Sequence, residues 1–355
     1  MFIGLTGSLY SGKHTIARYL IDHHNFQYVT LDIDPRAKEF DAMTFNTAKE
    51  IQEFTTKNWR SNYVICHIAT VKELSLYRKR PFFLLVAVDA PLLVRYHRWL
   101  NKNMLENNDP SRLANFVLES DALMYHSKKT SDESNITVPV YKQAKLAELS
   151  ILNPFDNTEE LHKHLDSLDM INPDRLRPSW DTYFMLLSEL AARRANCMKR
   201  RVGCILVKNN RVISTGYNGK PRNLKNCNDG GCERCNEGAK CGVDLGTCLC
   251  LHAEENALLE AGRERLEGPG HAILYCNTCP CLGCAKKIVQ VGVKEVVYSQ
   301  AYGMDEKTAE MFCEAGIQLR QHTPVSLSSE LEGDSKLLSN ALINQFQMTT
   351  DLFNP

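Results

Sequence analysis

The chain has 355 residues, and its 43% hydrophobic and 24% charged residues give it the composition of an ordinary globular protein. At this length we expect two domains. The 42 basic and 42 acidic residues cancel, so the total charge gives no support for nucleic acid as a partner. No apolar run approaches the ~20 residues of a membrane-spanning helix, and the first residues lack the pattern of a secretory signal, so we expect no membrane partner.

The first half of the chain opens with a strand, a loop and a helix. Residues 1–5 are apolar and predict a strand, and residues 16–20 begin a helix. Between them lies the pattern G-x-x-x-x-G-K, whose backbone amides and lysine bind phosphates at a helix N-terminus. His14 follows the lysine directly, where a hydroxyl would hold Mg²⁺, so we favour a retained fold with degraded chemistry over a working kinase. The residues that would bind a nucleotide, with or without Mg²⁺, are Gly7, Gly12, Lys13 and Thr15.

The remainder of this half alternates apolar strands and helices, which indicates a parallel α/β sheet. Strands are predicted over residues 28–34 and 82–88, and a last strand leads to a helix that starts at Thr158. Together with the loop, these elements resemble the small P-loop kinases of the dephospho-coenzyme A kinase type. We therefore expect a P-loop domain over residues 1–168 and a proline-containing linker over residues 169–179.

The second half also alternates helices and strands. The predicted elements are a helix over 180–196, strands over 202–208 and 212–217, a helix over 252–261, a strand over 272–275, a helix from Pro280, a strand over 293–298, a helix over 306–315 and a strand over 317–319. Asn209-Asn210, between the first two strands, suits the tight turn of a hairpin. We expect this domain over residues 180–321, followed by a partly disordered tail over 322–355 with a short amphipathic piece over 337–346.

Two short motifs in the second domain supply ligands for one metal ion. His252 and Glu254 open one predicted helix, and Cys281 and Cys284 open another with C-x-x-C spacing. The three ligands His252, Cys281 and Cys284 would leave the fourth position of a tetrahedral zinc ion open, which is typical of a catalytic site. Glu254 is then free to carry protons. The alternative is a structural zinc knuckle in which Glu254 caps a helix.

The pattern H-x-E followed by P-C-x-x-C is the signature of zinc-dependent nucleobase deaminases. Further motifs resemble the deoxycytidylate deaminase family in its long form with an N-terminal P-loop extension, and these are residues 198–203, 215–221, 252–257 and 295–298. The resemblance implies a cytidine deaminase-like three-layer α/β/α domain. It also implies a homo-oligomer, a hexamer in relatives, that converts dCMP to dUMP and ammonia for thymidylate synthesis. Activation by dCTP and inhibition by dTTP are implied as well.

For this reaction the resemblance implies that a zinc-activated water attacks C4 of the cytosine ring while Glu254 carries protons to N3 and to the leaving amine. It also implies that Asn218 contacts the sugar or base edge and that Arg263 and Tyr302 hold the 5′-phosphate, where a guanidinium suits phosphate geometry. From the residues alone, Asn218 is equally a turn former, and Arg263 could be a solvated helix end. Residues 191–228 carry ten Lys or Arg and no Asp or Glu, and we expect the triphosphate effector there.

Thirteen of the fourteen cysteines lie between Cys197 and Cys313. Without a secretory signal, this clustering indicates metal binding in a reducing compartment, the cytoplasm or also the nucleus. A second, structural zinc ion is therefore expected, and free thiols are the alternative. The candidate ligands are Cys197, Cys227, Cys232, Cys235, Cys241, Cys248 and Cys250. Spacing does not select four of them, and the resemblance implies ligands at Cys197, Cys227 and Cys250.

Three other functions compete with this interpretation. A deaminase of the same fold could act on another ring, such as a tRNA adenosine or a pterin-like compound, although a tRNA enzyme should carry a basic excess. A nucleotide-binding regulator would make the P-loop primary, which the intact zinc motifs disfavour. A bifunctional protein would add a live kinase in front of the deaminase.

Overall fold

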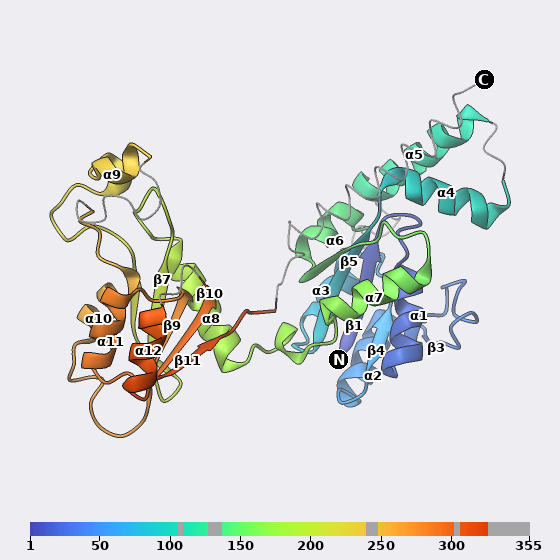
Figure 1. Cartoon of the computed structure of the whole chain (residues 1–355). Coiled ribbons are helices and arrows are strands. Elements are labelled where there is room, and N and C mark those ends of the chain that lie inside the picture. Colours follow the sequence, from blue (N-terminus) through green and yellow to red (C-terminus); the bar gives the residue numbers. More distant parts are fainter. Residues whose placement is uncertain (106–108, 127–136, 239–247, 302–305, 326–355) are drawn as a thin grey trace. The chain divides into compact units, whose positions relative to one another are not determined.

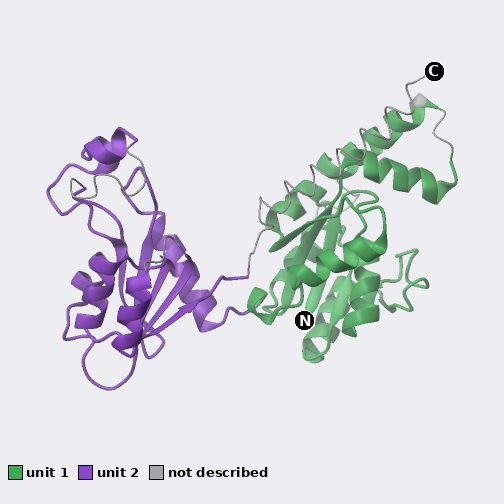
Figure 2. Cartoon of the chain, viewed as in Figure 1, with its two compact units in different colours: residues 1–176, 326–355 green, residues 177–325 purple. Residues whose placement is uncertain are grey.

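The computed structural model describes residues 1–105, 109–126, 137–238, 248–301 and 306–325. The chain divides into two compact units, whose described parts lie within Met1–Leu176 and Arg177–Val325 (Figure 2). Each unit has its own β-sheet and its own hydrophobic core. Among the described residues, no helix is both long and apolar enough to cross a membrane.

The first unit is built on a six-stranded sheet in which all pairings are parallel, in the order β3-β2-β4-β1-β5-β6 (Figure 1). Its strands are β1 (Phe2–Gly7), β2 (Gln27–Leu31), β3 (Met43–Phe45), β4 (Tyr63–Ile65), β5 (Phe83–Asp89) and β6 (Leu149–Leu152). The central strands β1 and β5 are continuous apolar runs because both faces of a parallel sheet are covered. The parallel α/β class predicted for this half is confirmed.

Helices cover both faces of this sheet. They are α1 (Lys13–His24), α2 (Ala48–Lys57), α3 (Val71–Arg78), α4 (Leu92–Asn103), α5 (Pro110–Tyr125), α6 (Val140–Leu146), α7 (Thr158–Leu168) and the 3₁₀ turn η1 (Pro173–Arg175). Alternate residues of β1 enter separate cores: Ile3 packs with Leu20 of α1 and Leu161 of α7, whereas Phe2 packs with Ile51 of α2 and Leu74 of α3. This alternation follows from the two-residue period of a strand.

Strand β2 ends three residues before the predicted strand of residues 28–34 does. The chain turns at Leu31, where the backbone N–H of Asp34 donates to the Leu31 carbonyl. The buried Asp34 carboxylate then accepts hydrogen bonds from the hydroxyl groups of Thr30 and Tyr28. A carboxylate placed after an apolar run therefore terminates the strand by folding back onto it.

The second unit is built on a five-stranded mixed sheet in the order β11-β10-β9-β7-β8. Its strands are β7 (Gly203–Lys208), β8 (Arg211–Tyr217), β9 (Ala272–Thr278), β10 (Glu295–Gln300) and β11 (Gln318–Gln321). β7 runs antiparallel to both β8 and β9, and β9, β10 and β11 are parallel. Asn209 and Asn210 both have positive φ, 52° and 58°, which is the turn geometry that Asn tolerates in a two-residue hairpin.

Helices lie on both faces of the second sheet, which confirms the three-layer α/β/α arrangement (Figure 1). The helices on the faces are α8 (Trp180–Ala192), α10 (Ala253–Ala261), α11 (Leu282–Gln290) and α12 (Glu306–Glu314). The 3₁₀ turn η2 (Cys227–Asp229) and the short helix α9 (Glu233–Asn236) lie in the segment between β8 and α10. Phe184 and Met185 of α8 pack against Ile205 and Val207 on one face. Helices α10, α11 and α12 pack on the other face, around Leu206 and Leu274.

Two glycines on the neighbouring strands β7 and β8 let helices approach this sheet closely from both faces. A Cβ atom at Gly203 would lie 2.0 Å from the Ser188 carbonyl oxygen of α8. A Cβ atom at Gly216 would lie 2.0 Å from the Ala253 carbonyl oxygen of α10. Gly216 pairs with Cys204, the residue after Gly203, so both close approaches occur at one point of the sheet.

Several predicted boundaries of the second unit shift for local reasons. Helix α8 ends at Ala192 and not near Asn196, because the backbone N–H of Asn196 leaves the helix and donates to the Asn218 carbonyl. Pro280 is not the first helical residue as predicted, since Cys281 occupies the cap position and α11 begins at Leu282. Residues 169–176, predicted as linker, pack on the first unit, where Met170 is buried.

Candidate metal and catalytic site

The residues of the two predicted zinc motifs meet where two helices begin. His252 is the N-cap of α10 and Cys281 is the N-cap of α11, while Cys284 lies in the first turn of α11. Their ligand atoms all lie within 4.8 Å of one another. The structure therefore brings together, from segments twenty-nine and more residues apart, the three side chains that the spacing of the motifs had selected.

The distances between these ligand atoms fit a tetrahedral zinc ion. His252 Nδ1 lies 3.5 Å from Cys281 Sγ and 3.3 Å from Cys284 Sγ. With zinc bonds of about 2.1 Å to nitrogen and about 2.3 Å to sulfur, a tetrahedron has an N···S edge of about 3.6 Å. Hydrogen bonds from Cys284 and His252 lower the pKa of the Cys281 thiol to about 3. One imidazole and two sulfurs are thus prearranged for zinc, and no fourth side chain joins this group among the described residues.

Glu254 lies beside the three ligands and is not part of the group. Its side chain is only 4% exposed, and it belongs to the first turn of α10. Burial raises the pKa of its carboxyl group, opposed in part by a backbone hydrogen bond and the charge of His252. A buried carboxyl group with a raised pKa, next to a metal-ligand set, is suited to carry a proton in both directions.

A salt bridge that spacing does not reveal joins the two ligand-bearing helices. Glu255 of α10 forms an ion pair with Lys287 of α11. The other carboxylate oxygen of Glu255 accepts a hydrogen bond from the His252 backbone N–H, 2.7 Å away, which caps α10. Glu255 therefore fixes both the backbone of one ligand and the neighbouring helix. Sequence analysis missed this role because the partner lies on another element.

The β8 strand holds α10 against the sheet from below the site. Asn256 Nδ2 donates to the Tyr217 carbonyl at 2.7 Å, and the Ser214 hydroxyl donates to the Ala257 carbonyl at 2.7 Å. Together with the close approach at Gly216, these bonds fix the orientation of the helix that carries His252 and Glu254. The motif residue Asn256 thus has a structural task that its sequence position alone did not show.

Asn218 is buried and uses its amide group within the protein. Its Oδ1 accepts from the Val202 backbone N–H at 2.9 Å, and its Nδ2 donates to the Arg200 carbonyl at 2.8 Å. The residue therefore holds the segment before β7.

Arg263 lies at the opposite end of α10 from His252. The nine-residue helix separates them by about 14 Å, and the Arg263 guanidinium pairs with Glu267 at 2.9 Å on the surface. Within one chain, the structure therefore does not bring Arg263 to the metal ligands. Tyr302, the other predicted phosphate contact, lies outside the described residues, as do Cys241 and the tail segment over 337–346.

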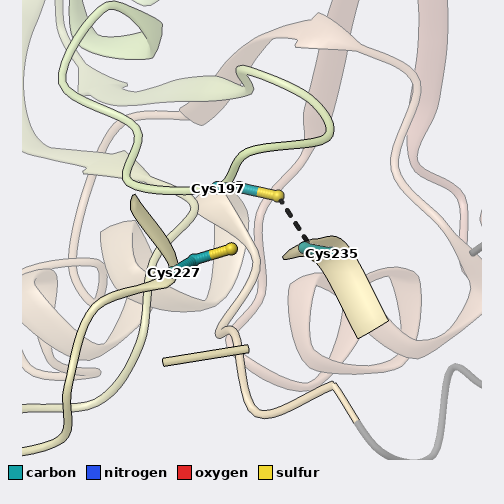
Figure 3. A group of neighbouring side chains, drawn as sticks. All are labelled: Cys197, Cys227 and Cys235. Carbon is teal, nitrogen blue, oxygen red and sulfur yellow. Dashed lines mark hydrogen bonds between the residues drawn. The ribbon is translucent and has the colours of Figure 1, made fainter. Parts of the chain in front are cut away.

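Six of the seven candidate thiols for a second metal site gather near one another: Cys197, Cys227, Cys232, Cys235, Cys248 and Cys250. Two groups of three have sulfur atoms within 4.8 Å of each other, Cys197 with Cys227 and Cys235, and Cys232 with Cys235 and Cys248. Figure 3 shows the first group, with Cys197, Cys227 and Cys235 on three neighbouring pieces of chain and a dashed line between Cys197 and Cys235. All six are free thiols, so no disulfide connects them.

In the first unit, the predicted phosphate loop joins β1 to α1 and depends on its glycines. A Cβ atom at Gly7 would lie 2.0 Å from the Val88 carbonyl oxygen, and Gly12 has a φ of 96° that favours glycine. The Arg98 guanidinium donates to the Tyr10 and Ser11 carbonyls, and Asn153 Nδ2 donates to the Ser11 carbonyl at 2.8 Å. The protein's own side chains therefore hold this loop in place.

A cavity of about 480 Å³ opens beside this loop and is lined by basic groups. Its lining includes Lys13, His14, Arg36, Arg98 and Lys102, and no acidic residue lines it among those described. Burial lowers the pKa of the Lys13 ammonium group, as does the charge of Arg36. Thr15 also lines the cavity. Three of the four predicted loop residues, Gly12, Lys13 and Thr15, therefore line a positively charged recess.

The three ligands and the buried Glu254 indicate a zinc-dependent deaminase, and a family of known sequences agrees with that class. The sequence profile of the "Cytidine and deoxycytidylate deaminase zinc-binding region" matches residues 178–300, which contain both ligand-bearing helices. Among solved structures, the dCMP deaminase of cyanophage S-TIM5 in complex with dCMP and dUMP is 30% identical and covers 41% of this chain and 98% of its own, with a TM-score of 0.34.

Two fungal relatives extend the similarity to nearly the whole chain. The deoxycytidylate deaminase of Schizosaccharomyces pombe is 46% identical over 329 residues, 91% of this chain and 97% of the relative. The deoxycytidylate deaminase of Saccharomyces cerevisiae is 40% identical over 321 residues, 90% of this chain and 96% of the relative. The chain belongs to the deoxycytidylate deaminase family, in the long form that these two proteins share.

Proposed function

We propose that this protein hydrolyses the 4-amino group of dCMP to give dUMP and ammonia, and so supplies dUMP for thymidylate synthesis. Membership of the deoxycytidylate deaminase family supports this proposal. The observation that carries it is the open set of three ligands at the starts of α10 and α11, with the buried Glu254 beside them. His252, Cys281 and Cys284 would hold the zinc ion.

Each residue of the site has a separate task in this reaction. A zinc ion bound by the three ligands supplies a Lewis acid that makes water nucleophilic near neutral pH. Glu254 accepts the proton of the attacking water as the C4–O bond forms and delivers it to ring N3. It then takes the proton of the new C4 hydroxyl and transfers it to the amino group, so that the C4=O bond of dUMP forms as the C4–N bond breaks and ammonia leaves. Burial raises the pKa of the Glu254 carboxyl group, which favours the protonated form that donates in both transfers.

Ultraviolet loss of the cytosine chromophore tests this proposal. The full chain is incubated with dCMP, deoxycytidine and CMP in parallel, each with and without dCTP. We expect turnover of dCMP, acceleration by dCTP and inhibition by dTTP. Turnover of another substrate and not of dCMP would favour a deaminase of a different nucleobase compound. No turnover of any of them by the zinc-loaded protein would contradict the proposal.

The contacts to the phosphate and the assembly are part of the same proposal. Because Arg263 lies about 14 Å along α10 from His252, we propose that it reaches a 5′-phosphate only in the site of another copy. A homo-oligomer, a hexamer by family resemblance, would provide that arrangement. Arg263→Ala should then raise KM for dCMP much more than KM for deoxycytidine. Equal effects on both substrates would contradict a phosphate contact.

A second candidate function concerns the first unit, where the basic cavity beside Lys13 favours nucleotide binding. We propose that this recess binds a nucleoside triphosphate, with Gly7, Gly12, Lys13 and Thr15 around the phosphates. Calorimetric titration of the full chain with ATP, dCTP and inorganic triphosphate tests it. Lys13→Met should abolish the binding, and Lys57→Met, an exposed residue of α2, should not. ATP turnover by the same protein would establish the bifunctional alternative.

The cluster of thiols leads to a proposal about metal content and compartment. Thiolates at this density favour a structural zinc ion, and they bind zinc only while reduced. We therefore propose that the protein works in the cytoplasm or nucleus and contains zinc in addition to the catalytic ion.

A further inference from the structure

The six clustered thiols come from three separate stretches of the second unit. Cys197 lies between α8 and β7, and the second stretch contains Cys227 of η2 and Cys232 and Cys235 at α9. Cys248 and Cys250 lie just before His252. Six sulfur atoms from such separate stretches exceed the four that one tetrahedral zinc ion uses. A single zinc ion would therefore leave two of the six thiols without a role as ligands.

The sulfur atoms form two groups and not one. Cys197, Cys227 and Cys235 make the first group, and Cys232, Cys235 and Cys248 make the second, so Cys235 belongs to both. Cys197 Sγ and Cys235 Sγ are 3.9 Å apart. With zinc–sulfur bonds of about 2.3 Å, the edge of a ZnS₄ tetrahedron is about 3.8 Å, whereas a disulfide bond is about 2.05 Å. The observed spacing is that of two ligands on one metal ion.

From these positions we infer that the cluster is a binuclear zinc–thiolate centre in which Cys235 is shared by two zinc ions. This inference rests on the proposed zinc-binding role of the cluster and not on the deaminase activity. Two tetrahedral ions need eight ligand positions, and six thiolates supply them when two thiolates bridge. We assign Cys227 as the second bridge, because it belongs to the first group and interacts electrostatically with Cys232 of the second. Cys250 completes the first group through its contact with Cys197.

Burial is deepest at three of the six thiols. Cys227, Cys232 and Cys235 are 0%, 3% and 8% exposed, whereas Cys197, Cys248 and Cys250 are half-buried. Both thiolates assigned as bridges are therefore among the buried ones, as ligands between two ions should be. Backbone amides also point at the sulfurs: the Met198 N–H donates to Cys227 and the Lys199 N–H donates to Cys197, each at 3.4 Å. Such bonds stabilise thiolates over thiols.

The centre is connected to the catalytic site by a short piece of chain. Cys250 and His252 are separated only by Leu251, which exchanges two backbone hydrogen bonds with Gly219, at 3.2 and 2.9 Å. Gly219 follows Asn218, whose amide holds the segment that leads from Cys197 to β7. Metal binding in the cluster therefore fixes both sides of the segment that places His252. We expect loss of the cluster ions to weaken binding of the catalytic ion as well.

Zinc stoichiometry of the full chain tests the inference, measured by elemental analysis and by native mass spectrometry. We expect three zinc ions per chain, and X-ray absorption should show a zinc–zinc scattering path. Two ions per chain without that path would overturn the inference and leave a single structural zinc. One ion per chain would show that the cluster holds no metal. Neither of these results would affect the deaminase proposal, which is read from turnover of dCMP.

Three variants locate the ions. Cys235→Ser should lose at least one cluster ion, whereas Cys281→Ser should lose only the catalytic ion and retain two. Cys313→Ser, at an exposed position on α12, is the matched control and should retain all three. If Cys235→Ser does not fold, the count in the unmodified chain still decides the question. A folded Cys235→Ser protein that keeps three ions would overturn the shared role of Cys235.

Discussion

The two units of this chain both direct helix N-termini at a prospective ligand, but they prepare them differently. At α10 and α11 the cap residues His252 and Cys281 are themselves the ligands, and their surroundings hold them in place without filling the site. At α1 the loop carbonyls already accept hydrogen bonds from Arg98 and Asn153. Each motif therefore identifies where a ligand would bind, and the side chains around it determine which groups remain available to that ligand.

The largest expected effect is on turnover, and it concerns the proton carrier beside the three metal ligands of the second unit. Glu254→Gln removes the proton carrier while leaving every metal ligand in place, so turnover of dCMP should fall by about 10²–10⁴-fold. Zinc content should be unchanged. Glu260→Gln, exposed at the other end of the same helix, is the matched control and should retain activity. Full activity of a zinc-loaded Glu254→Gln protein would exclude the role assigned to this residue.

The next largest effect is on zinc affinity, and it concerns Glu255, which holds the backbone of one metal ligand and the neighbouring helix. Glu255→Ala removes the hydrogen bond to the His252 backbone and the ion pair with Lys287. Loss of such outer contacts weakens metal binding by about 10–100-fold, so competition with a chelator should show weaker zinc binding. Lys286→Ala changes a neighbouring exposed lysine and should have no such effect. Equal zinc affinity in Glu255→Ala and the unmodified protein would disprove the positioning role.

A partly buried ion network in the second unit allows the stability of the two units to be measured separately. Asp181 accepts two hydrogen bonds from Arg320, at 2.7 and 2.8 Å, and one from the Tyr275 hydroxyl. Asp181→Asn should lower the stability of the second unit by about 2 kcal/mol near pH 7. Thermal unfolding of the full chain should show this shift in one transition only.

The pH dependence of the same variant has a definite sign. The bonds from Arg320 lower the pKa of the folded Asp181 below its ordinary value. Their contribution is therefore fully present above the unfolded pKa, about 3.9, and is lost as the pH falls through the lower folded pKa. The difference between Asp181→Asn and the unmodified protein should shrink below about pH 4. Glu310→Gln, an exposed carboxylate on α12, should show no such convergence.

The smallest effect tests the glycine of the phosphate loop. Gly12→Ala places a Cβ atom 2.2 Å from Asn153 Nδ2 at a φ of 96°. We expect the first unit to lose about 1–2 kcal/mol of stability. Gly262→Ala is the control, because it has a similar positive φ of 66° but open space around it. A loss no larger in Gly12→Ala than in Gly262→Ala would mean that the contact with Asn153 is loose.

Sequence reasoning found the parts of the site that depend on local spacing. His252, Glu254, Cys281 and Cys284 each lie within a few residues of a helix start, so the motif and the fold class could be predicted together. The hairpin at Asn209-Asn210 was also predictable, because turn geometry selects its residues. Strand ends were less predictable, as at Asp34, where a side chain folds back to end β2.

What sequence reasoning missed depends on partners from distant elements. One example is the ion pair of Glu255 with Lys287, and another is the hydrogen bonding of Asn218 to the segment before β7. In both cases the partners are far apart in the sequence, at a spacing that no helix or strand repeat predicts. Spacing also could not divide the clustered thiols, because the two groups share Cys235 and draw on three stretches of chain. Only coordinates show such relations. The role of Arg263 likewise depends on the length of α10, which puts it far from His252.

The close approach of helices at Gly203 and Gly216 has a consequence for how this chain can vary. Neither glycine has a side chain that could contact the metal ligands. Any larger residue, however, would push α8 or α10 off the sheet. In a saturation mutagenesis library selected for activity, these two positions should be as intolerant as the ligands themselves. Intolerance at these two positions would thus reflect the close packing of α8 and α10 on the sheet and not a role in the reaction.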